Sequence, residues 1–588
     1  MCDYIKTKIV CTLGPATDDD QTLEAMILAG MNVARLNFSH GSYEDHKRRA
    51  DKVKEISKKL GIPVALLLDT KGPDMRVGTF EGGSAEVKAG DSFVFTTLPW
   101  EGSSEKAQVL YDKLPQKVSA GNTIMVDDGL VQMVVTDVNK TDVVCRVVIG
   151  GKISNNKSVN VPQVKLDIPF LRENDVRDLL FGIENDFDFV AASFTRSASD
   201  ILSIKKILEE NGGGDIRIIA KIENFEGIEN IDEILKVSDG VMVARGDMGV
   251  EIPFEEIPAL QKMIIKKTME SGKPAITATQ MLESMIHNPR PTRAEITDVA
   301  NAIYDGTSAI MLSGETAVGK YPVEAVSTMS RIAKKTEEDI NYIKRFSEND
   351  YIANVNITTA ISHATCSAAH DLGAAAIITL TMSGTTARMM SKYRPACPII
   401  GCTSREKTMR FMCLSWGVIP VYLENMEDSG ELFERAVDVA LERGYVKSGE
   451  MVVISAGLPL GIQGTTNILK VEIAGHVLIN AKGSGQSPVS APVCVCKSAK
   501  EAEKKFNDGD ILVISNTDND LLPIIKRASG LVIESASSAS HGVIVGLTLD
   551  LPVIYAASNA TDILKCGAIV TLDPSCGAVY SGTVKVGQ

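Results

Sequence analysis

Eight short apolar runs, each followed by a segment with helical spacing, are the feature that most restricts how this 588-residue chain can fold. Apolar side chains in the helical segments recur every three or four residues, as at Ile257, Leu260 and Ile264. Eight alternating strand–helix units are typical of a closed (β/α)₈ barrel rather than of an open sheet. The expected strands are 8–14, 33–38, 64–69, 189–194, 216–223, 240–246, 274–280 and 308–314.

A stretch of a different character interrupts these units between the third strand and the helix that begins near Glu173. Its β-type runs are separated by turn residues such as Gly90 and Gly129. A barrel does not need so long a loop, so we expect an inserted all-β domain that acts as a lid. The runs lie at 85–95, 123–126, 130–138 and 143–150.

Two further α/β patterns follow the barrel, and the Gly/Ser/Pro-rich segment 482–492 between them is typical of a flexible linker. We therefore expect an α/β protein of four domains. They are a barrel (1–71 and 168–347), a small β-barrel lid (72–167), an α/β regulatory domain (348–474), and a linker with a small C-terminal domain (475–588).

Composition excludes several classes of function. A hydrophobic content of 44% rules out wholesale disorder, and a net charge of −14 argues against a nucleic-acid partner. No apolar run approaches the ~18 residues of a membrane span, and we expect neither a signal peptide nor a membrane partner. Eleven cysteines without metal-ligand spacing are typical of reduced thiols, so we expect a cytoplasmic protein.

Charged side chains gather at the carboxyl ends of the expected barrel strands, where barrel enzymes carry their active sites. Strand residues two apart share a face, so Lys221 and Glu223 lie together, and Asp247 at the next strand end adds a second carboxylate. Such a pair suits Mg²⁺, which keeps positions for water and substrate oxygens. Arg35, Lys221 and Arg245 would surround that ion with positive charge, which suits a phosphate-bearing substrate.

Two other interpretations compete at these strand ends. Any single pair of charges could be a structural ion pair, but six of the eight strand ends carry such groups. The segment 314–320 reads G-x-x-x-x-G-K, the start of a P-loop. Tyr321 and Pro322 stand where a Ser or Thr would hold Mg²⁺, so we reject the P-loop.

These segments resemble the active-site segments of the pyruvate kinase family, and the resemblance covers essentially the whole chain. IIAKIENFEGI, MVARGDMGVEIP, ATQMLESM, PRPTRAEITDVANAI and MLSGETAVGKYP occur in the family's order. The resemblance implies transfer of the phosphoryl group of phosphoenolpyruvate to ADP, giving ATP and pyruvate, in the last step of glycolysis. It also implies Mg²⁺ (or Mn²⁺) and K⁺ as cofactors, and a homotetramer.

The resemblance further implies roles for single residues. Lys221 would stabilise the phosphoryl group in transfer, Thr279 would lie beside the methylene carbon of the enolate, and Arg35 would hold the substrate. Substrate contacts would also come from Ser193, Arg245, Gly246 and Asp247; Mg²⁺ ligands from Glu223 and Asp247; K⁺ ligands from Asn37, Ser39, Asp69 and Thr70; and nucleotide contacts from Asn37, His40, Arg76 and Lys157.

Two positions depart from the family's pattern. Asp74 replaces a glutamate that the family links to K⁺ dependence, so we expect K⁺ activation with an altered affinity. Gln163 stands where glycine is common near the lid hinge, and it would stiffen or shift lid closure.

A loop in the regulatory domain, formed by Thr381, Ser383, Gly384, Thr385 and Thr386, joins a strand to a helix and is suited to bind an anion. The alternative is an ordinary N-cap by Thr385 or Thr386. Because the family binds a phosphorylated effector at this loop, the resemblance favours a sugar phosphate or AMP here, with a contribution from the facing segment 457–464.

The C-terminal tail resembles the phosphohistidine swivelling domain of phosphoenolpyruvate-utilising enzymes. Their signature GG-x-T-S-H-A reads ASSASHG at 536–542, so His541 is kept while both glycines and the threonine are lost. With the supporting residues changed, we expect a histidine that packs or hydrogen-bonds at a helix start rather than a phosphoryl acceptor.

Two other classes of function stay in view. A related barrel lyase or aldolase acting on a phosphoenolpyruvate-like substrate would not need the lid or the K⁺ ligands. A non-catalytic binding protein would not need Lys221, Glu223, Asp247 and Thr279 together.

Overall fold

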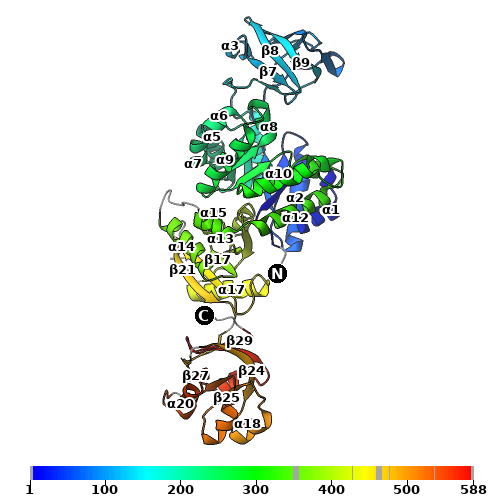
Figure 1. The fold of residues 1–588 in the computed structure, drawn as a ribbon. Helices are drawn as coiled ribbons and strands as arrows, with labels where there is room; N and C mark the ends of the chain where they lie inside the picture. Colours follow the sequence, from blue (N-terminus) through cyan, green and yellow to red (C-terminus); the bar gives the residue numbers. More distant parts are fainter. Residues whose placement is uncertain are drawn as a thin grey trace.

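The computed structural model describes residues 4–348, 356–426, 428–457, 466–475, 477–485, 487–535 and 537–583. The elements form four bodies in succession along an elongated molecule: the lid, the barrel, the regulatory domain and the C-terminal domain (Figure 1). No helix in the described ranges is long and apolar enough to cross a membrane.

Eight parallel strands close into a barrel in the order β1-β16-β15-β14-β13-β12-β3-β2, which confirms the predicted fold class. The strands are apolar and buried nearly throughout because helices cover the barrel outside and side chains fill it inside. The strands are β1 (Lys8–Thr12), β2 (Val33–Asn37), β3 (Ala65–Asp69), β12 (Phe189–Ala192), β13 (Arg217–Ile222), β14 (Gly240–Ala244), β15 (Ala275–Ala278) and β16 (Ala309–Leu312). The principal helices are α1 (Asp20–Leu28), α2 (Tyr43–Leu60), α4 (Glu173–Glu184), α5 (Ala198–Glu210), α7 (Ile231–Val237), α9 (Ile257–Glu270), α10 (Arg293–Tyr304) and α12 (Pro322–Asp339).

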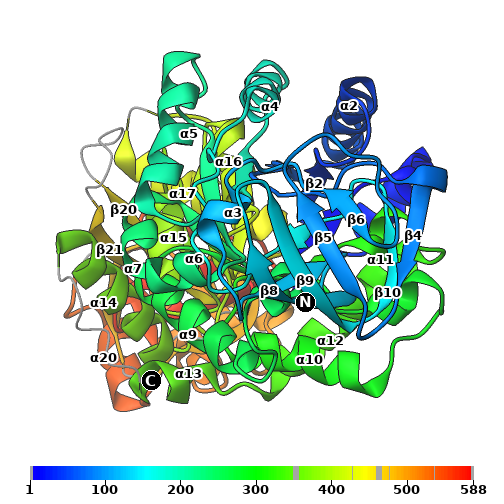
Figure 2. The ribbon, with the colours of Figure 1, turned by 90° about the horizontal axis from the view of Figure 1, so that it is seen from above.

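The lid is an all-β insertion after β3 with an apolar core of its own. A six-stranded sheet (β11-β7-β8-β9-β5-β6) and a two-stranded sheet (β10-β4) build it. It lies over the barrel when the molecule is viewed from above (Figure 2). Its strands are β4 (Ser84–Val87), β5 (Ser92–Thr96), β6 (Lys106–Gln108), β7 (Thr123–Val126), β8 (Val131–Val138), β9 (Asp142–Ile149), β10 (Gly151–Ser154) and β11 (Val159–Asn160).

The regulatory domain has a five-stranded sheet in the order β19-β18-β17-β20-β21. The strands β17 to β20 have the apolar runs typical of buried strands. The antiparallel edge strand β21 is mostly half-buried, and polar residues interrupt its apolar ones. The elements are β17 (Ala376–Leu380), β18 (Ile399–Thr403), β19 (Val418–Tyr422), β20 (Met451–Gly457), β21 (Thr466–Ile473), and helices α13 (Tyr342–Glu348), α14 (Ile357–Asp371), α15 (Thr385–Lys392), α16 (Glu406–Met412) and α17 (Ser429–Glu442).

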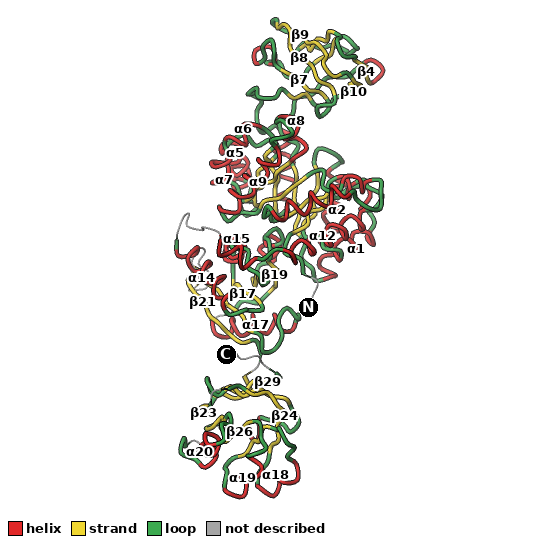
Figure 3. Tube along the Cα trace, in the orientation of Figure 1, coloured by secondary structure: helices red, strands yellow, loops and turns green. Residues whose placement is uncertain are grey.

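The C-terminal domain has an eight-stranded sheet, and the prediction of a flexible linker at 482–492 is wrong. Strands β23 and β24 occupy most of that segment (Figure 3). Gly483 serves close packing, because a Cβ there would come within 1.9 Å of the Pro574 carbonyl oxygen. The elements are β22 (Val477–Asn480), β23 (Lys482–Ser484), β24 (Val489–Val495), β25 (Ile511–Ile514), β26 (Gly530–Ile533), β27 (Val553–Tyr555), β28 (Ile569–Asp573), β29 (Ala578–Ser581), and helices α18 (Ala499–Lys505), α19 (Leu522–Ile525), α20 (His541–Thr548) and α21 (Ala560–Ile563).

Two cations of α16 in the regulatory domain form salt bridges with aspartates at the amino-terminal end of the barrel. Arg410 Nε lies 2.8 Å from Asp188 Oδ1, and Arg410 Nη2 and Lys407 Nζ each lie 2.6 Å from a carboxylate oxygen of Asp186. The Asp188 carboxylate is fully buried and also accepts the N–H of Leu66 at 2.8 Å. Burial raises the pKa of Asp188, and Arg410 and Lys407 oppose that shift.

Replacing Arg410 by Met should lower the free energy of unfolding by on the order of 3 kcal/mol, because it leaves the buried Asp188 carboxylate without its closest cation. Urea denaturation measures the loss. Asp186→Asn is the matched control: that carboxylate is 55% exposed, so its loss should cost under about 1 kcal/mol. Equal losses in the two variants would contradict the assignment.

Candidate active site

The carboxyl ends of β2, β3, β12 and β13 bring one carboxylate, two cations and a hydroxyl into a buried network. Asp69 ends β3 and accepts hydrogen bonds from Arg35 Nε at 2.6 Å and Lys221 Nζ at 3.1 Å. Ser193 Oγ lies 3.1 Å from Asp69 Oδ1 and 2.7 Å from the Thr70 carbonyl oxygen. The register of the parallel strands causes this meeting, since Asp69 pairs with residues of both β2 and β12.

Lys221 lies at the centre of the network. Its Nζ donates to Ser193 Oγ at 2.7 Å and lies 2.9 Å from Glu223 Oε1, in addition to its contact with Asp69. Burial lowers the pKa of Lys221, but Asp69, Glu223 and Asp247 raise it by more, so the net pKa lies above the usual value. The ammonium therefore stays charged although it is almost enclosed.

The carboxylates of Glu223 and Asp247 form the candidate metal site. Glu223 is 1% exposed, and its Oε2 accepts the N–H of Phe194 at 2.6 Å. Burial raises the pKa of Glu223, Asp247 raises it further, and Lys221 opposes the shift. The described part of the chain holds no cluster of three or more His, Cys, Asp or Glu that could bind a metal. Two hard oxygen donors fit Mg²⁺, which would complete its shell with water and substrate oxygens.

Thr279 is held in a strained conformation beside this pair. Its φ of +69° is a left-handed value that β-branched residues rarely adopt. The N–H of Gly246 donates to Thr279 Oγ1 at 2.8 Å, and Arg245 Nη2 donates to the Thr279 carbonyl at 2.7 Å. Arg245 Nη1 also pairs with Asp298 at 2.7 Å, so its guanidinium is engaged by the protein.

The predicted K⁺ ligands lie at the adjoining ends of β2 and β3, where Asn37 is the register partner of Asp69. Asn37 Oδ1 accepts the N–H of Ser39 at 3.1 Å, which folds the chain after β2 over this edge. With Thr70 next to Asp69, amide, hydroxyl, carboxylate and carbonyl oxygens are gathered here, and such oxygens are the ligands that hard cations prefer.

Of the predicted nucleotide contacts, Asn37 lies beside Asp69 in the strand register. Among the described residues, no contact joins the side chains of the other three, His40, Arg76 and Lys157, to the network. His40 is exposed just beyond β2. Arg76 pairs with Asp74 at the lid hinge, and Lys157 lies 2.8 Å from Asp127 inside the lid.

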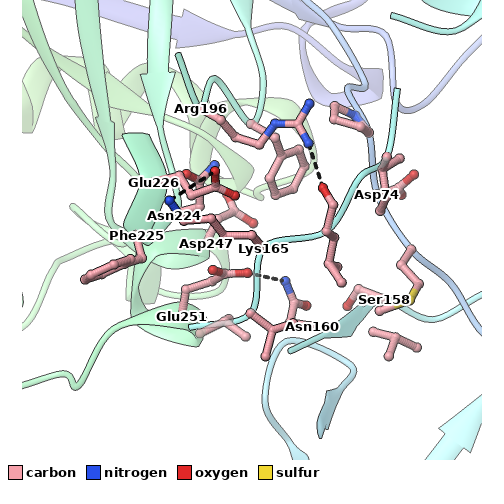
Figure 4. A pocket seen from close by; sticks show the side chains of 18 of the residues that line it. Asp74, Ser158, Asn160, Lys165, Arg196, Asn224, Phe225, Glu226, Asp247 and Glu251 are labelled. Carbon is pink, nitrogen blue, oxygen red and sulfur yellow. Dashed lines mark hydrogen bonds and ion pairs between the residues drawn. The ribbon is translucent and has the colours of Figure 1, made fainter. Parts of the chain in front are cut away.

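A cavity of about 130 Å³ separates the lid hinge from the barrel. Across it Asn160 Nδ2 lies 3.5 Å from Glu251 Oε1, and Asp74 and Asp247 line other walls (Figure 4). Gln163 also lines it and has a φ of +61°, a value that glycine adopts without strain. The glycine that the resemblance leads us to expect at this position would adopt that φ without strain.

Sequence reasoning missed two residues of the site. Thr12 Oγ1 accepts from Arg35 Nη1 at 2.8 Å, and Asp298 on α10 holds Arg245. Thr12 could have been predicted as a site residue, because it ends the first strand of the barrel. Nothing in the sequence pairs Asp298 with Arg245, because the contact depends on how α10 packs.

The loop before α15 lacks the ordinary N-cap. Gly384, with a φ of +79°, occupies the N-cap position, and no side chain in the described ranges caps the helix. Thr386 Oγ1 instead contacts Thr466 Oγ1 at 2.9 Å, and Ser383 Oγ lies 3.0 Å from Thr385 Oγ1. Of the facing segment 457–464, all but its first residue lies outside the described residues.

His541 begins α20 and has a partner on each ring nitrogen. Nδ1 lies 3.3 Å from Thr517 Oγ1 and Nε2 lies 3.1 Å from Asn519 Oδ1. The imidazole is thus fixed by its own domain.

Comparisons with known proteins point the same way as the geometry. Family models described as "Pyruvate kinase, barrel domain", "Pyruvate kinase, alpha/beta domain" and "PEP-utilising enzyme, mobile domain" match residues 4–326, 359–472 and 506–577. Pyruvate kinases of Bacillus licheniformis and Geobacillus stearothermophilus are each 48% identical over 583 residues, covering 99% of this chain and 100% and 99% of those proteins. A crystal structure of a pyruvate kinase from Cryptosporidium parvum superimposes with a TM-score of 0.76 at 39% identity, covering 80% of this chain and 96% of that one.

The Glu251 carboxyl should make stability depend on pH. Burial raises its pKa to about 7, Glu226 adds to the rise and Asn160 opposes it. Because the folded-state pKa is raised, this group's contribution to stability falls as pH rises from the unfolded value through about 7. Glu251→Gln keeps an acceptor for Asn160 but does not titrate. Between pH 5 and pH 8 the free energy of unfolding of this variant, relative to that of the wild type, should therefore increase by on the order of 1–3 kcal/mol. The difference between the two melting temperatures, measured across this pH range, checks it. A difference that does not change with pH would contradict this.

Proposed function

The chain belongs to the pyruvate kinase family, and on that premise we propose which of its residues carry the reaction. The enzyme transfers the phosphoryl group of phosphoenolpyruvate to ADP, giving ATP and pyruvate. The observation that supports the assignment of residues best is the buried network in which Asp69, Ser193 and Glu223 converge on Lys221.

Lys221 and Arg35 neutralise the charge that spreads during transfer. The P–O bond to the enol oxygen breaks while an oxygen of the ADP β-phosphate forms the new bond, and the enolate keeps the electron pair. Lys221, held charged by its carboxylates, is proposed to stabilise both the phosphoryl group and the enolate oxygen. Arg35 is fixed by Asp69 and Thr12, so its position costs no reorganisation during the reaction.

Glu223 and Asp247 would hold Mg²⁺ or Mn²⁺, and Ser193 would contact the substrate beside them. When bound, the ion supplies charge neutralisation at the phosphate and carboxylate oxygens. The family generally requires Mg²⁺ and K⁺, and the oxygen donors at the two strand ends suit both.

Thr279 is proposed to serve the delivery of a proton to the methylene carbon of the enolate, with water as the carrier. Its hydroxyl accepts from the N–H of Gly246, and its carbonyl is held by Arg245. Arg245 therefore acts as a positioning residue for Thr279, which differs from the substrate contact that the resemblance implies. His40, Arg76 and Lys157 would meet ADP once the lid has moved toward the barrel.

A coupled assay with phosphoenolpyruvate, ADP, Mg²⁺ and K⁺ tests this assignment. Lys221→Met should lower kcat by about 10³-fold or more, because it removes the charge that stabilises the transition state. Lys206→Met, which changes an exposed lysine on α5, is the control and should leave kcat unaltered. A Lys221→Met variant within tenfold of wild type would refute the role of Lys221.

For K⁺, the proposed ligands are Asn37, Ser39, Asp69 and Thr70. Asp74 is engaged by Arg76 and by Arg172 at 3.3 Å, so its effect on K⁺ would act through the hinge. Velocity should be higher in K⁺ than in Na⁺ or without a monovalent ion, and Asp74→Glu should change the K⁺ concentration for half-activation. Equal velocities under all three conditions would contradict K⁺ activation.

An activating sugar phosphate or AMP is proposed to bind the loop Thr381–Thr386. No side chain of a described residue caps α15, so its first backbone N–H groups can donate to an anion there. Ser383→Asp should abolish the lowering of the phosphoenolpyruvate KM by such an activator, since it places a negative charge at the anion site. Ser199→Asp, an exposed serine on α5, is the control. An activator response that survives Ser383→Asp would show that the site lies elsewhere.

The remaining assignments are proposals of the same kind. We divide the chain at 71/72, 167/168, 347/348 and 474/475, and expect a cytoplasmic homotetramer. His541 is proposed to stabilise its domain through Thr517 and Asn519 rather than to accept a phosphoryl group.

A further inference from the structure

The described residues that line a small cavity at the junction of the barrel and the regulatory domain include four cations and no carboxylate. Its volume of about 10 Å³ has room for one water-sized species. Its lining comes from both bodies: from residues of the barrel such as Ser308, and from α15, which lies at the boundary between the two (Figure 1). The cations are Lys273, which precedes β15, Arg388 and Lys392 on α15, and Arg394 just beyond it.

Two of these cations have no polar partner within the described ranges. Lys392 is 8% exposed and makes neither a hydrogen bond nor an ion pair there; its ammonium lies 5.7 Å from the centre of the Tyr393 ring. Its stem runs past Gly272, where a Cβ would lie 3.7 Å from Lys392 Cδ. Arg388 likewise makes no hydrogen bond or ion pair with a described residue. Because a buried charge without a counter-charge is costly, a negative charge in the cavity would be stabilising.

The other two cations contact neutral acceptors. Lys273 Nζ donates to the carbonyls of Leu235 and of Ser238, the latter at 2.5 Å. Arg394 Nη2 donates to the Gly306 carbonyl at 2.9 Å and to Ser308 Oγ at 3.0 Å. Such contacts orient the two cations, and the guanidinium carbon of Arg394 also lies 4.6 Å from the centre of the Trp416 ring.

The two carboxylates that act electrostatically on these cations each have another partner. Asp239 acts on Arg388 and Lys273, but it pairs with Arg217 at 3.3 Å. Glu270 acts on Lys392, but it lies 3.9 Å from the exposed Lys266. Burial lowers the pKa of Lys392 and lowers that of Lys273 to about 8, with Arg388 adding to the latter shift.

We propose that this cavity binds a small inorganic anion of halide size, with chloride as the physiological ligand, held between Lys273 of the barrel and Arg388 and Lys392 of α15. The cavity is too small for a phosphate group. The anion joins the two domains at the carboxyl-terminal end of the helix whose other end forms the proposed effector loop, and it is distinct from that loop.

Thermal unfolding at constant ionic strength tests the proposal, with sodium chloride against sodium gluconate, an anion too large to enter. The melting temperature should rise with chloride and saturate; at ten times the dissociation constant, the ratio of unfolded to folded protein falls about elevenfold. Phosphate that stabilises where chloride does not would overturn the halide assignment, as would equal melting temperatures in chloride and gluconate.

The melting temperatures of variants, with and without chloride, test whether these side chains bind the anion. Lys392→Met and Arg388→Met should lose the chloride response, and in gluconate they should melt at or above the wild-type temperature because an unpaired cation is gone. Lys392→Gln is a second, polar replacement, and Lys236→Met, at an exposed position on α7, is the control that keeps the response. Variants that retain the response would contradict the site, and so would crystals grown in bromide that show no anomalous peak between these side chains.

Discussion

The buried carboxylate of Asp69 is the constraint on which the active site depends. It lies at a point where Arg35, Lys221 and Ser193 meet, and each of these comes from a different strand of the barrel. Burial raises the pKa of Asp69, but Arg35 and Lys221 lower it by more, so the net pKa is below the usual value. The ionised carboxylate and the two cations therefore stabilise one another in an enclosed site, ready for an anionic substrate.

At the neighbouring strand ends, too, hydrogen bonds and ion pairs hold the functional side chains in place. Thr279 keeps its left-handed backbone because Gly246 and Arg245 hold both its hydroxyl and its carbonyl, and Asp298 holds Arg245 in turn. Strain of this kind persists only where surrounding contacts outweigh it, and it is concentrated at functional sites. By contrast, the contacts described between the lid and the barrel lie near the hinge. They include Asn160 to Glu251 at 3.5 Å, Arg196 to the Leu166 carbonyl at 3.1 Å and Arg172 to Asp74 at 3.3 Å, an arrangement that suits a part that has to move.

Much of the fold could be predicted because the strands are apolar and bounded by turn residues. Helix α2 begins and ends where its sequence signals place it, with Ser42 in a capping box and Gly61 in a left-handed C-cap. The segment 482–492 was misjudged because composition cannot distinguish a flexible glycine from one, such as Gly483, that another backbone approaches closely. At the site, the rule that strand residues two apart share a face correctly predicted that Lys221 and Glu223 lie together. The pairing of Arg245 with Asp298 depends on helix packing, which no local sequence pattern encodes.

The most direct test of the network is a double-mutant cycle between Asp69 and Lys221, measured as kcat/KM for phosphoenolpyruvate under single-turnover conditions. Because Asp69 acts by holding Lys221 charged and in place, Asp69→Asn with Lys221→Met should lose little more activity than Lys221→Met alone. Losses that multiply would show that the two residues act independently, and would contradict the account.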